Sequence, residues 1–117
     1  MNVSRFICNI SWRYLLIAAL SLLSFFAHAE HRLLILDSQS GEPYDTAREA
    51  MLTELEFQGY SVGKNLTIRR HDIHNKVGLG LRLLQVESLR GYDVVFINGT
   101  IANQAAYQFG YDNPQYS

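Results

Sequence analysis

Cysteine and proline are both scarce in this chain of 117 residues. The one cysteine, Cys8, precedes a long apolar run, and the two prolines are Pro43 and Pro114. If the N-terminal segment is removed, the remainder has no cysteine, which excludes disulfides and thiolate chemistry from it. The sequence also lacks low-complexity tracts, runs of like charge and internal repeats.

Residues 1–29 have the pattern of a cleavable secretory signal peptide. Arg5 and Arg13 supply positive charge, and no acidic residue occurs before Glu30. The apolar run 14–27 is shorter than the roughly 20 residues of a membrane-spanning helix. Residues 27–29 (AHA) place small side chains where signal peptidase needs them. We expect cleavage after residue 29 and an exported product without a stable membrane span; an uncleaved membrane anchor is the alternative.

Residues 30–117 are mildly acidic. The whole chain has 10 basic and 11 acidic residues, and loss of Arg5 and Arg13 changes the formal net charge from −1 to −3. A segment of this charge lacks the basic excess with which proteins neutralise nucleic-acid phosphates. We therefore expect no nucleic-acid partner.

Three short apolar segments predict β-strands. Residues 33–36 and 94–97 are continuous apolar runs, which are typical of strands that are covered on both faces in a parallel sheet. Residues 66–72 alternate apolar with polar and charged side chains, as at the edge of a sheet. Helical patterns lie between and after the strands, with Pro43 in the first turn of the first helix.

The helices are predicted from their apolar positions and their end signals. The first has the stripe Tyr44, Ala47, Met51, Leu52 and Leu55, and Gly59 ends it. The second is expected over 77–90, capped by Asn75, with buried positions that include Val77, Leu81, Leu84 and Leu89. The third is expected over 101–109, closed by Gly110.

This alternation predicts an α/β fold: a Rossmann-like, three-layer parallel sheet with right-handed crossovers and helices on both faces. The polar character of strand 2 places it outside strand 1, which gives the order 2-1-3. The chain then reverses direction across the sheet between strands 1 and 3. Ligands of open α/β sheets bind at such a point, beyond the carboxyl ends of the strands.

Four short segments follow one another in a recognisable order. They are the first aliphatic strand, 47–49 (ARE), 55–60 (Leu followed by Gly-Tyr) and 63–68 (GKNLTI). This set resembles the substrate-binding family of ABC transporters whose members take up aromatic or branched amino acids. The family has a Thr-Pro-Ala-Ala-like helix start after a further apolar strand; residues 98–103 here read NGTIAN, which departs in detail.

The resemblance implies a bacterial periplasmic binding protein of type I, in which two Rossmann-like lobes close on a solute and dock on an inner-membrane permease. It implies an amino acid or similar small carboxylate as the solute, with no enzymatic activity and no cofactor. Two lobes of ordinary size need far more chain than residues 30–117 provide. We therefore expect part of the first lobe, from a truncated reading frame or a fragment, with the apolar edge of strand 3 exposed.

The loops after strands 1 and 3 hold the candidate ligand-binding residues. Hydroxyls and unpaired N–H groups at helix N-termini favour a carboxylate. The candidates are Asp37, Ser38, Gln39, Ser40, Tyr44, Asn98, Gly99 and Thr100. Each role has a structural alternative: Ser40 and Thr100 as helix caps, Asp37 bound to the neighbouring loop instead of a ligand's ammonium, and Tyr44 packed in the core.

Other functions have weaker support in the sequence. His71, Asp72 and His74 suggest a metal site, but third and fourth ligands of matching spacing are missing. A hydrolase that uses a loop serine with His71 or His74 would lack any nucleophile-elbow motif. A sensor input domain of the same fold, or a small secreted structural domain, is the alternative outside transport.

Overall fold

A computed structural model describes residues 14–18 and 30–116 of the chain. The predicted signal peptide therefore lies outside the described residues, except for a helical turn over 14–18, and it stays a prediction. Within the described ranges, we find no helix that is both long enough and apolar enough to span a bilayer.

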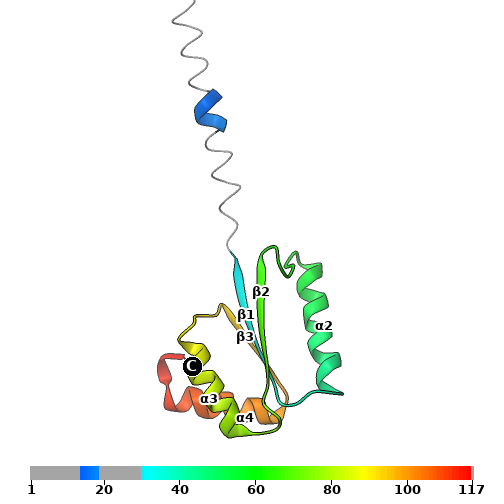
Figure 1. The fold of residues 1–117 in the computed structure, drawn as a ribbon, viewed down its shortest axis with the longest axis vertical. Helices are drawn as coiled ribbons and strands as arrows, with labels where there is room; N and C mark the ends of the chain where they lie inside the picture. The colour runs from blue at the N-terminus through cyan, green and yellow to red at the C-terminus, as the bar shows by residue number, and fades with distance from the viewer. Residues whose placement is uncertain (1–13, 19–29, 117) are drawn as a thin grey trace, which may run out of the picture.

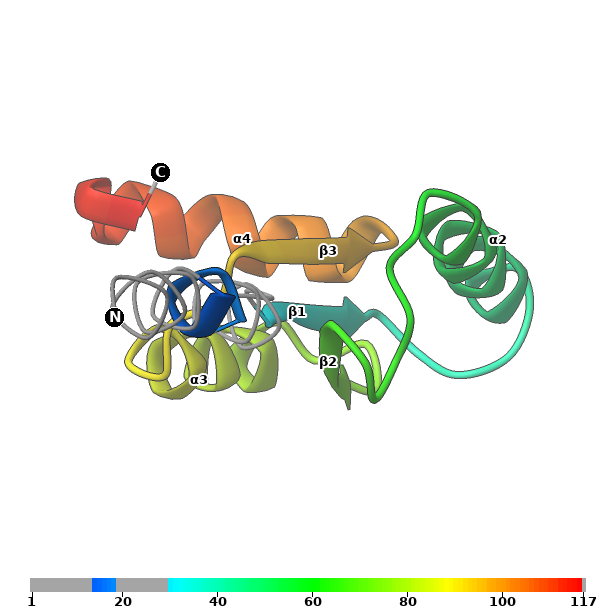
Figure 2. The same cartoon turned by 90° about the horizontal axis from the view of Figure 1, so that it is seen from above.

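Three parallel strands form one sheet: β1 (His31–Asp37), β2 (Leu66–Asp72) and β3 (Val94–Asn98). Figure 1 labels the three strands, and Figure 2 shows their order β2-β1-β3, which confirms the predicted α/β class, the all-parallel sheet and the strand order. Asp37 is in register with Asp72 on one side and with Asn98 on the other. All three strands thus end on a polar residue at the same level.

The helices cover both faces of this sheet. They are α2 (Tyr44–Phe57), α3 (Val77–Ser88) and α4 (Thr100–Asp112), followed by a short 3-10 turn over Pro114–Tyr116. Seen along the sheet, α2 lies on one side, and α3 and α4 lie together on the other (Figure 2). Right-handed crossovers place their helices on opposite faces when they run in opposite directions across a sheet, as the connections from β1 to β2 and from β2 to β3 do here.

Side chains of β1 alternate between two apolar clusters, as a strand covered on both faces requires. Leu34 and Leu36 pack on the α3 and α4 side with Ile73, Leu84 and Phe109. Leu33 and Ile35 pack on the α2 side with Leu66, against the half-buried side chains Met51, Leu52 and Leu55. No residue of α2 is fully buried, so the α2 layer is the less tightly packed of the two.

Two of the predicted helix positions are wrong at α3. Asn75 does not cap this helix: Lys76 precedes it, and Asn75 has φ 56° and donates its side-chain amide to Gln39 Oε1 over 2.6 Å. Leu89 is 83 % exposed rather than buried, because α3 ends at Ser88 and Leu89 follows the last turn.

Two more predictions are wrong in α2 and α4. Ala47 is exposed, because the face of α2 that meets the sheet is the one with Met51, Leu52 and Leu55. Gly110 does not close α4, which continues to Asp112. The end is set by Asn113 instead, whose backbone N–H and side-chain amide both donate to the Phe109 carbonyl (2.9 and 3.0 Å) and so satisfy one of its last orphan acceptors.

Candidate functional site

The two loops at the carboxyl ends of β1 and β3 lie side by side. Ser38 N donates to the Asn98 carbonyl over 2.9 Å, and the Ser38 carbonyl accepts from Asn75 N over 2.7 Å. The first loop is therefore held between the ends of β3 and β2. The two loop-to-helix junctions thus lie next to each other, as the strand order 2-1-3 predicts.

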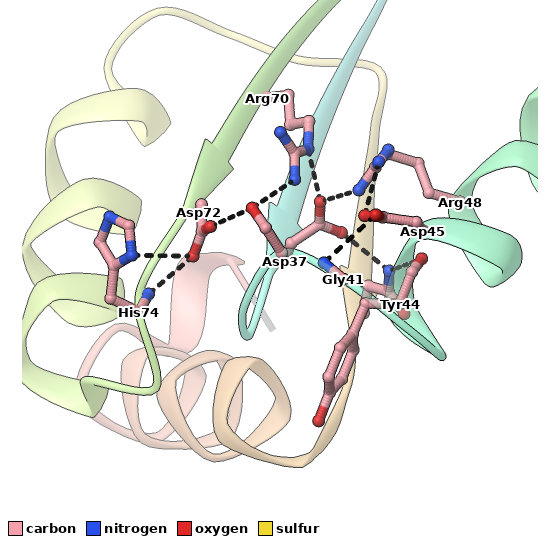
Figure 3. Close-up of polar contacts among 10 residues, drawn as sticks. Asp37, Gly41, Tyr44, Asp45, Arg48, Arg70, Asp72 and His74 are labelled. Carbon is pink, nitrogen blue, oxygen red and sulfur yellow. Dashed lines mark hydrogen bonds and ion pairs between the residues drawn. The ribbon is translucent and has the colours of Figure 1, made fainter.

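A buried carboxylate, Asp37, is at the centre of this edge (Figure 3). Its Oδ2 atom accepts from the guanidinium of Arg48 on α2 and from Nε of Arg70 on β2, the latter over 2.5 Å. Its Oδ1 atom accepts from Asn98 Nδ2 over 2.8 Å. Two cations and an amide therefore surround this carboxylate. The amide comes from the end of β3, beside the neighbouring loop of the structural alternative, whereas the two arginines come from α2 and β2, which the sequence did not suggest.

Arg48 joins α2 to the carboxyl edge. Its second guanidinium nitrogen, Nη2, also donates to Asp45 Oδ1 over 2.9 Å. Burial works against the charged form, but the hydrogen bonds and charges of Asp45 and Asp37 outweigh it and raise the pKa of Arg48. Arg48 therefore stays charged, and α2 is fixed to β1 at the end nearest the site.

Asp72, at the end of β2, uses both of its oxygens locally. Oδ2 accepts from the Ser40 hydroxyl, and Oδ1 accepts from His74 N over 2.8 Å. Burial opposes ionisation, but these hydrogen bonds and the charges of His74 and Arg70 lower the pKa of Asp72. The alternative in which Ser40 caps α2 is wrong, because its hydroxyl is directed to Asp72 and α2 has no side-chain cap.

Ser38, in the loop after β1, caps α4. Its buried hydroxyl accepts from Ala102 N over 2.9 Å. The first intrahelical bond of α4 is Asn103 N to Gly99 O, so the N–H groups of Thr100 and Ile101 precede the ladder and have no partner within the helix. Thr100 is the first residue of the helix and is exposed, so it is not the cap.

Gly99 lies where the two loops and α2 approach most closely. Its backbone has φ 96° and ψ 169°. An added Cβ would lie within 3.0 Å of the Tyr44 ring and 2.6 Å from Ser38 Oγ. The half-buried Tyr44 is thus not part of the stripe of α2 on the sheet: its ring covers Gly99, and its carbonyl accepts from Asn98 Nδ2 over 2.9 Å.

Five of the eight candidate residues therefore contact one another at the carboxyl edge. They are Asp37, Ser38, Tyr44, Asn98 and Gly99. Gln39 and Ser40 face β2 and the loop after it. Sequence reasoning missed Arg48 and Arg70. Arg70 falls on the face of Asp37 because Asp37 is in register with Asp72 and alternate residues of a strand share a face.

A second polar cluster lies on the opposite face of β2. Glu87 of α3, only 2 % exposed, accepts from His71 Nε2 (3.2 Å), the Tyr92 hydroxyl and Arg69 Nε (3.1 Å). Burial would raise the pKa of Glu87, but these hydrogen bonds and the charges of Arg69 and Arg90 lower it. Burial raises the pKa of the Tyr92 hydroxyl, and the hydrogen bond and charge of the neighbouring Glu87 raise it further.

This second cluster separates the residues of the metal alternative. His71 faces Glu87 on the α3 side, whereas Asp72 faces Ser40 at the carboxyl edge. Across residues 14–18 and 30–116, no three His, Cys, Asp or Glu side chains are grouped as metal ligands.

Comparison of the chain with protein-family models, with curated proteins and with solved structures finds no match. The resemblance to substrate-binding proteins therefore depends on the short segments described above. The chain is an α/β protein with a parallel sheet of order β2-β1-β3 and two adjoining loops at its carboxyl edge.

Proposed function

We propose that this chain is the periplasmic solute-binding component of an ABC-type importer and supplies one lobe of the clamp, with an amino acid or similar small carboxylate as the solute. The observation that carries the proposal is the pair of loop-to-helix junctions after β1 and β3, joined by the bond from Ser38 N to Asn98 O. Sheets of this strand order bind ligands at that position.

The start of α4 provides the anion site. The N–H groups of Thr100 and Ile101 are not used within the helix, and the helix dipole adds partial positive charge at the same point. A solute carboxylate binds these two donors, while the ring of Tyr44 beside Gly99 offers an apolar surface to the solute's side chain.

The charge balance at the edge permits an anion there. Asp37 is buried beside the start of α4 and would repel a carboxylate if it were uncompensated. Arg48 and Arg70 compensate it from two other elements. Since the Arg70 side chain is 36 % exposed, it also adds positive potential on the solvent side of the edge.

The two-lobe arrangement follows the type I periplasmic binding proteins that the sequence resembles. A second lobe closes over the carboxyl edge about a hinge, and the closed form docks on a membrane permease. The described lobe provides binding and orientation only, and no covalent step is part of the proposal.

Nuclear magnetic resonance tests the anion site directly. In a ¹⁵N-labelled chain, L-leucine or L-phenylalanine at millimolar concentration should shift the amide signals of Thr100 and Ile101. The matching amines without the carboxylate should leave these signals in place. Shifts confined to other regions, or equal shifts with the amines, would contradict the proposal.

A pair of variants at one position sharpens this test. Thr100→Pro removes the first N–H at a helix position that tolerates proline, and Thr100→Ala removes only the hydroxyl. A hydrogen bond to a charged group is worth about 1.5–3 kcal/mol, so Thr100→Pro should weaken carboxylate binding by roughly ten-fold or more. Thr100→Ala should bind like the unmodified chain.

A further inference from the structure

One peptide unit at the carboxyl edge combines a reactive sequence with a tightly held side chain. Asn98 is followed by Gly99, and this is the only Asn-Gly pair in the chain. The backbone nitrogen after an asparagine can attack the carbon of the side-chain amide, and glycine leaves this approach open because it has no Cβ. In this fold, Asn98 ends β3 and Gly99 leads into α4.

The folded edge keeps the Asn98 side chain away from this reaction. Asn98 is only 7 % exposed, and its Nδ2 atom donates twice, to Asp37 Oδ1 over 2.8 Å and to the Tyr44 carbonyl over 2.9 Å. The Asn98 carbonyl also accepts from Ser38 N. Ring closure requires a rotated side chain and a bent backbone, so these contacts must break first.

We propose that Asn98 is a deamidation site whose rate is set by the opening of the carboxyl edge. In the open state, the Gly99 nitrogen forms a bond to Asn98 Cγ, and the bond from Cγ to Nδ2 breaks. The proton of the attacking nitrogen passes through water to the leaving group, which departs as ammonia and leaves a five-membered imide. Water then opens the imide at either carbonyl and gives aspartate or isoaspartate.

The product cannot restore the closed edge. An ionised carboxylate only accepts hydrogen bonds, so aspartate at 98 has no donor for Asp37 Oδ1 or for the Tyr44 carbonyl. It also places a second negative charge beside Asp37, whose two arginine partners bind the other oxygen, Oδ2. Isoaspartate lengthens the backbone at the end of β3 by one methylene group. Either product therefore holds the loops after β1 and β3 less firmly.

The contacts of Asn98 predict how strongly the fold protects it. Breaking one hydrogen bond to a charged group lowers the population of the open state to roughly a tenth or less, and the bond to Asp37 is of this kind. Deamidation proceeds at the rate of the unfolded chain multiplied by the fraction of open edge. It should therefore be at least ten-fold slower in native buffer than in urea.

Peptide mass spectrometry of the full chain, incubated at mildly alkaline pH, measures both rates at Asn98. Gly99→Ala identifies the attacking nitrogen. In urea it should slow the reaction ten-fold or more, because the new Cβ obstructs the approach of this nitrogen, and the strain of the variant in the folded state plays no part there.

A pair of variants separates local opening from global unfolding. Ser38→Ala removes the cap of α4 and loosens the edge, whereas Gly80→Ala overpacks α3 against Ala105 and Ile73, outside the contacts of Asn98. Ser38→Ala should raise the native rate of deamidation roughly ten-fold, and Gly80→Ala should raise it less than two-fold. Neither variant should change the rate in urea.

Two variants at position 98 test the consequence of the reaction. Asn98→Ala removes the two donated hydrogen bonds, and Asn98→Asp also adds the charge. Asn98→Asp should therefore unfold at a lower urea concentration than Asn98→Ala near neutral pH. The difference should disappear in acid, where the new carboxyl group is protonated and can donate.

Three outcomes would overturn the proposal. They are equal rates at Asn98 in native buffer and in urea, a native rate that Ser38→Ala leaves unchanged, and a deamidated chain that unfolds at the same urea concentration as the starting chain. The first measurement uses the unmodified chain, so it decides the question even where a variant does not fold. No solute takes part in any of these measurements, so their results are separate from those of the solute proposal.

Discussion

Gly99→Ala probes the closest approach in the candidate site. Gly99 has φ 96° and ψ 169°, a region that side chains other than glycine's rarely adopt. The new methyl group would also fall within 3.0 Å of the Tyr44 ring and 2.6 Å from Ser38 Oγ. Two separate penalties therefore act at one position, backbone strain and overpacking.

Their sizes can be estimated separately. Backbone strain of this kind costs about 1–3 kcal/mol, and overpacking a closely packed site costs about 1–3 kcal/mol. We expect Gly99→Ala to lower the free energy of unfolding by roughly 2–6 kcal/mol in total. A domain of this size is stable by roughly 4–13 kcal/mol, so the loss is a large part of the whole.

Gly59→Ala is the matched control. Gly59 has φ 97°, almost the same as Gly99, but an added Cβ would meet nothing within 4 Å. Only the strain remains, about 1–2 kcal/mol. Urea unfolding followed by far-ultraviolet circular dichroism measures both variants, and Gly99→Ala should be the more destabilised by about 1–3 kcal/mol.

The double variant Gly99→Ala/Tyr44→Ala identifies the cause. Without the Tyr44 ring, the nearest obstacle to the new methyl group is gone. The double variant should therefore be more stable than the sum of the single losses predicts, by about 0.5–3 kcal/mol. Equal losses in the Gly99 and Gly59 variants, or strict additivity with Tyr44→Ala, would refute the close approach of α2 to the loop after β3.

Three further predictions concern stability. Gly80→Ala should destabilise the fold by about 1–2 kcal/mol, because the new Cβ would lie 2.7 Å from a methyl group of α4. Gly78→Ala has open space around it and should stabilise the fold by about 0.5–1 kcal/mol through helix propensity. Thermal unfolding of the two variants distinguishes these effects. The folded-state pKa of Glu87 is lower than its usual value of 4.5, so its contribution is complete above that pH and is lost as pH falls below it. Glu87→Gln should therefore reduce the fall in melting temperature between pH 6 and pH 3. Ser38→Ala leaves a buried N–H of α4 without its acceptor and should cost about 1–3 kcal/mol in urea unfolding, whereas Thr100→Ala should cost less than about 0.5 kcal/mol.

The sequence pattern was sufficient for the architecture. Continuous apolar runs predicted β1 and β3, and the alternating pattern of residues 66–72 correctly placed β2 at an edge. The predicted order also left strand 3 at the other edge with its apolar side exposed, and among the described residues β3 indeed pairs only with β1.

The contacts of the candidate site were harder to predict, because tertiary structure decides them. The cap of α4 comes from Ser38, which is far away in sequence, whereas cap rules consider only residues next to a helix. Likewise, Asp37 was a plausible partner for a ligand until the fold brought Arg48 and Arg70 to it from two other elements. Local patterns predict which residues meet at an edge but not which of them satisfy one another.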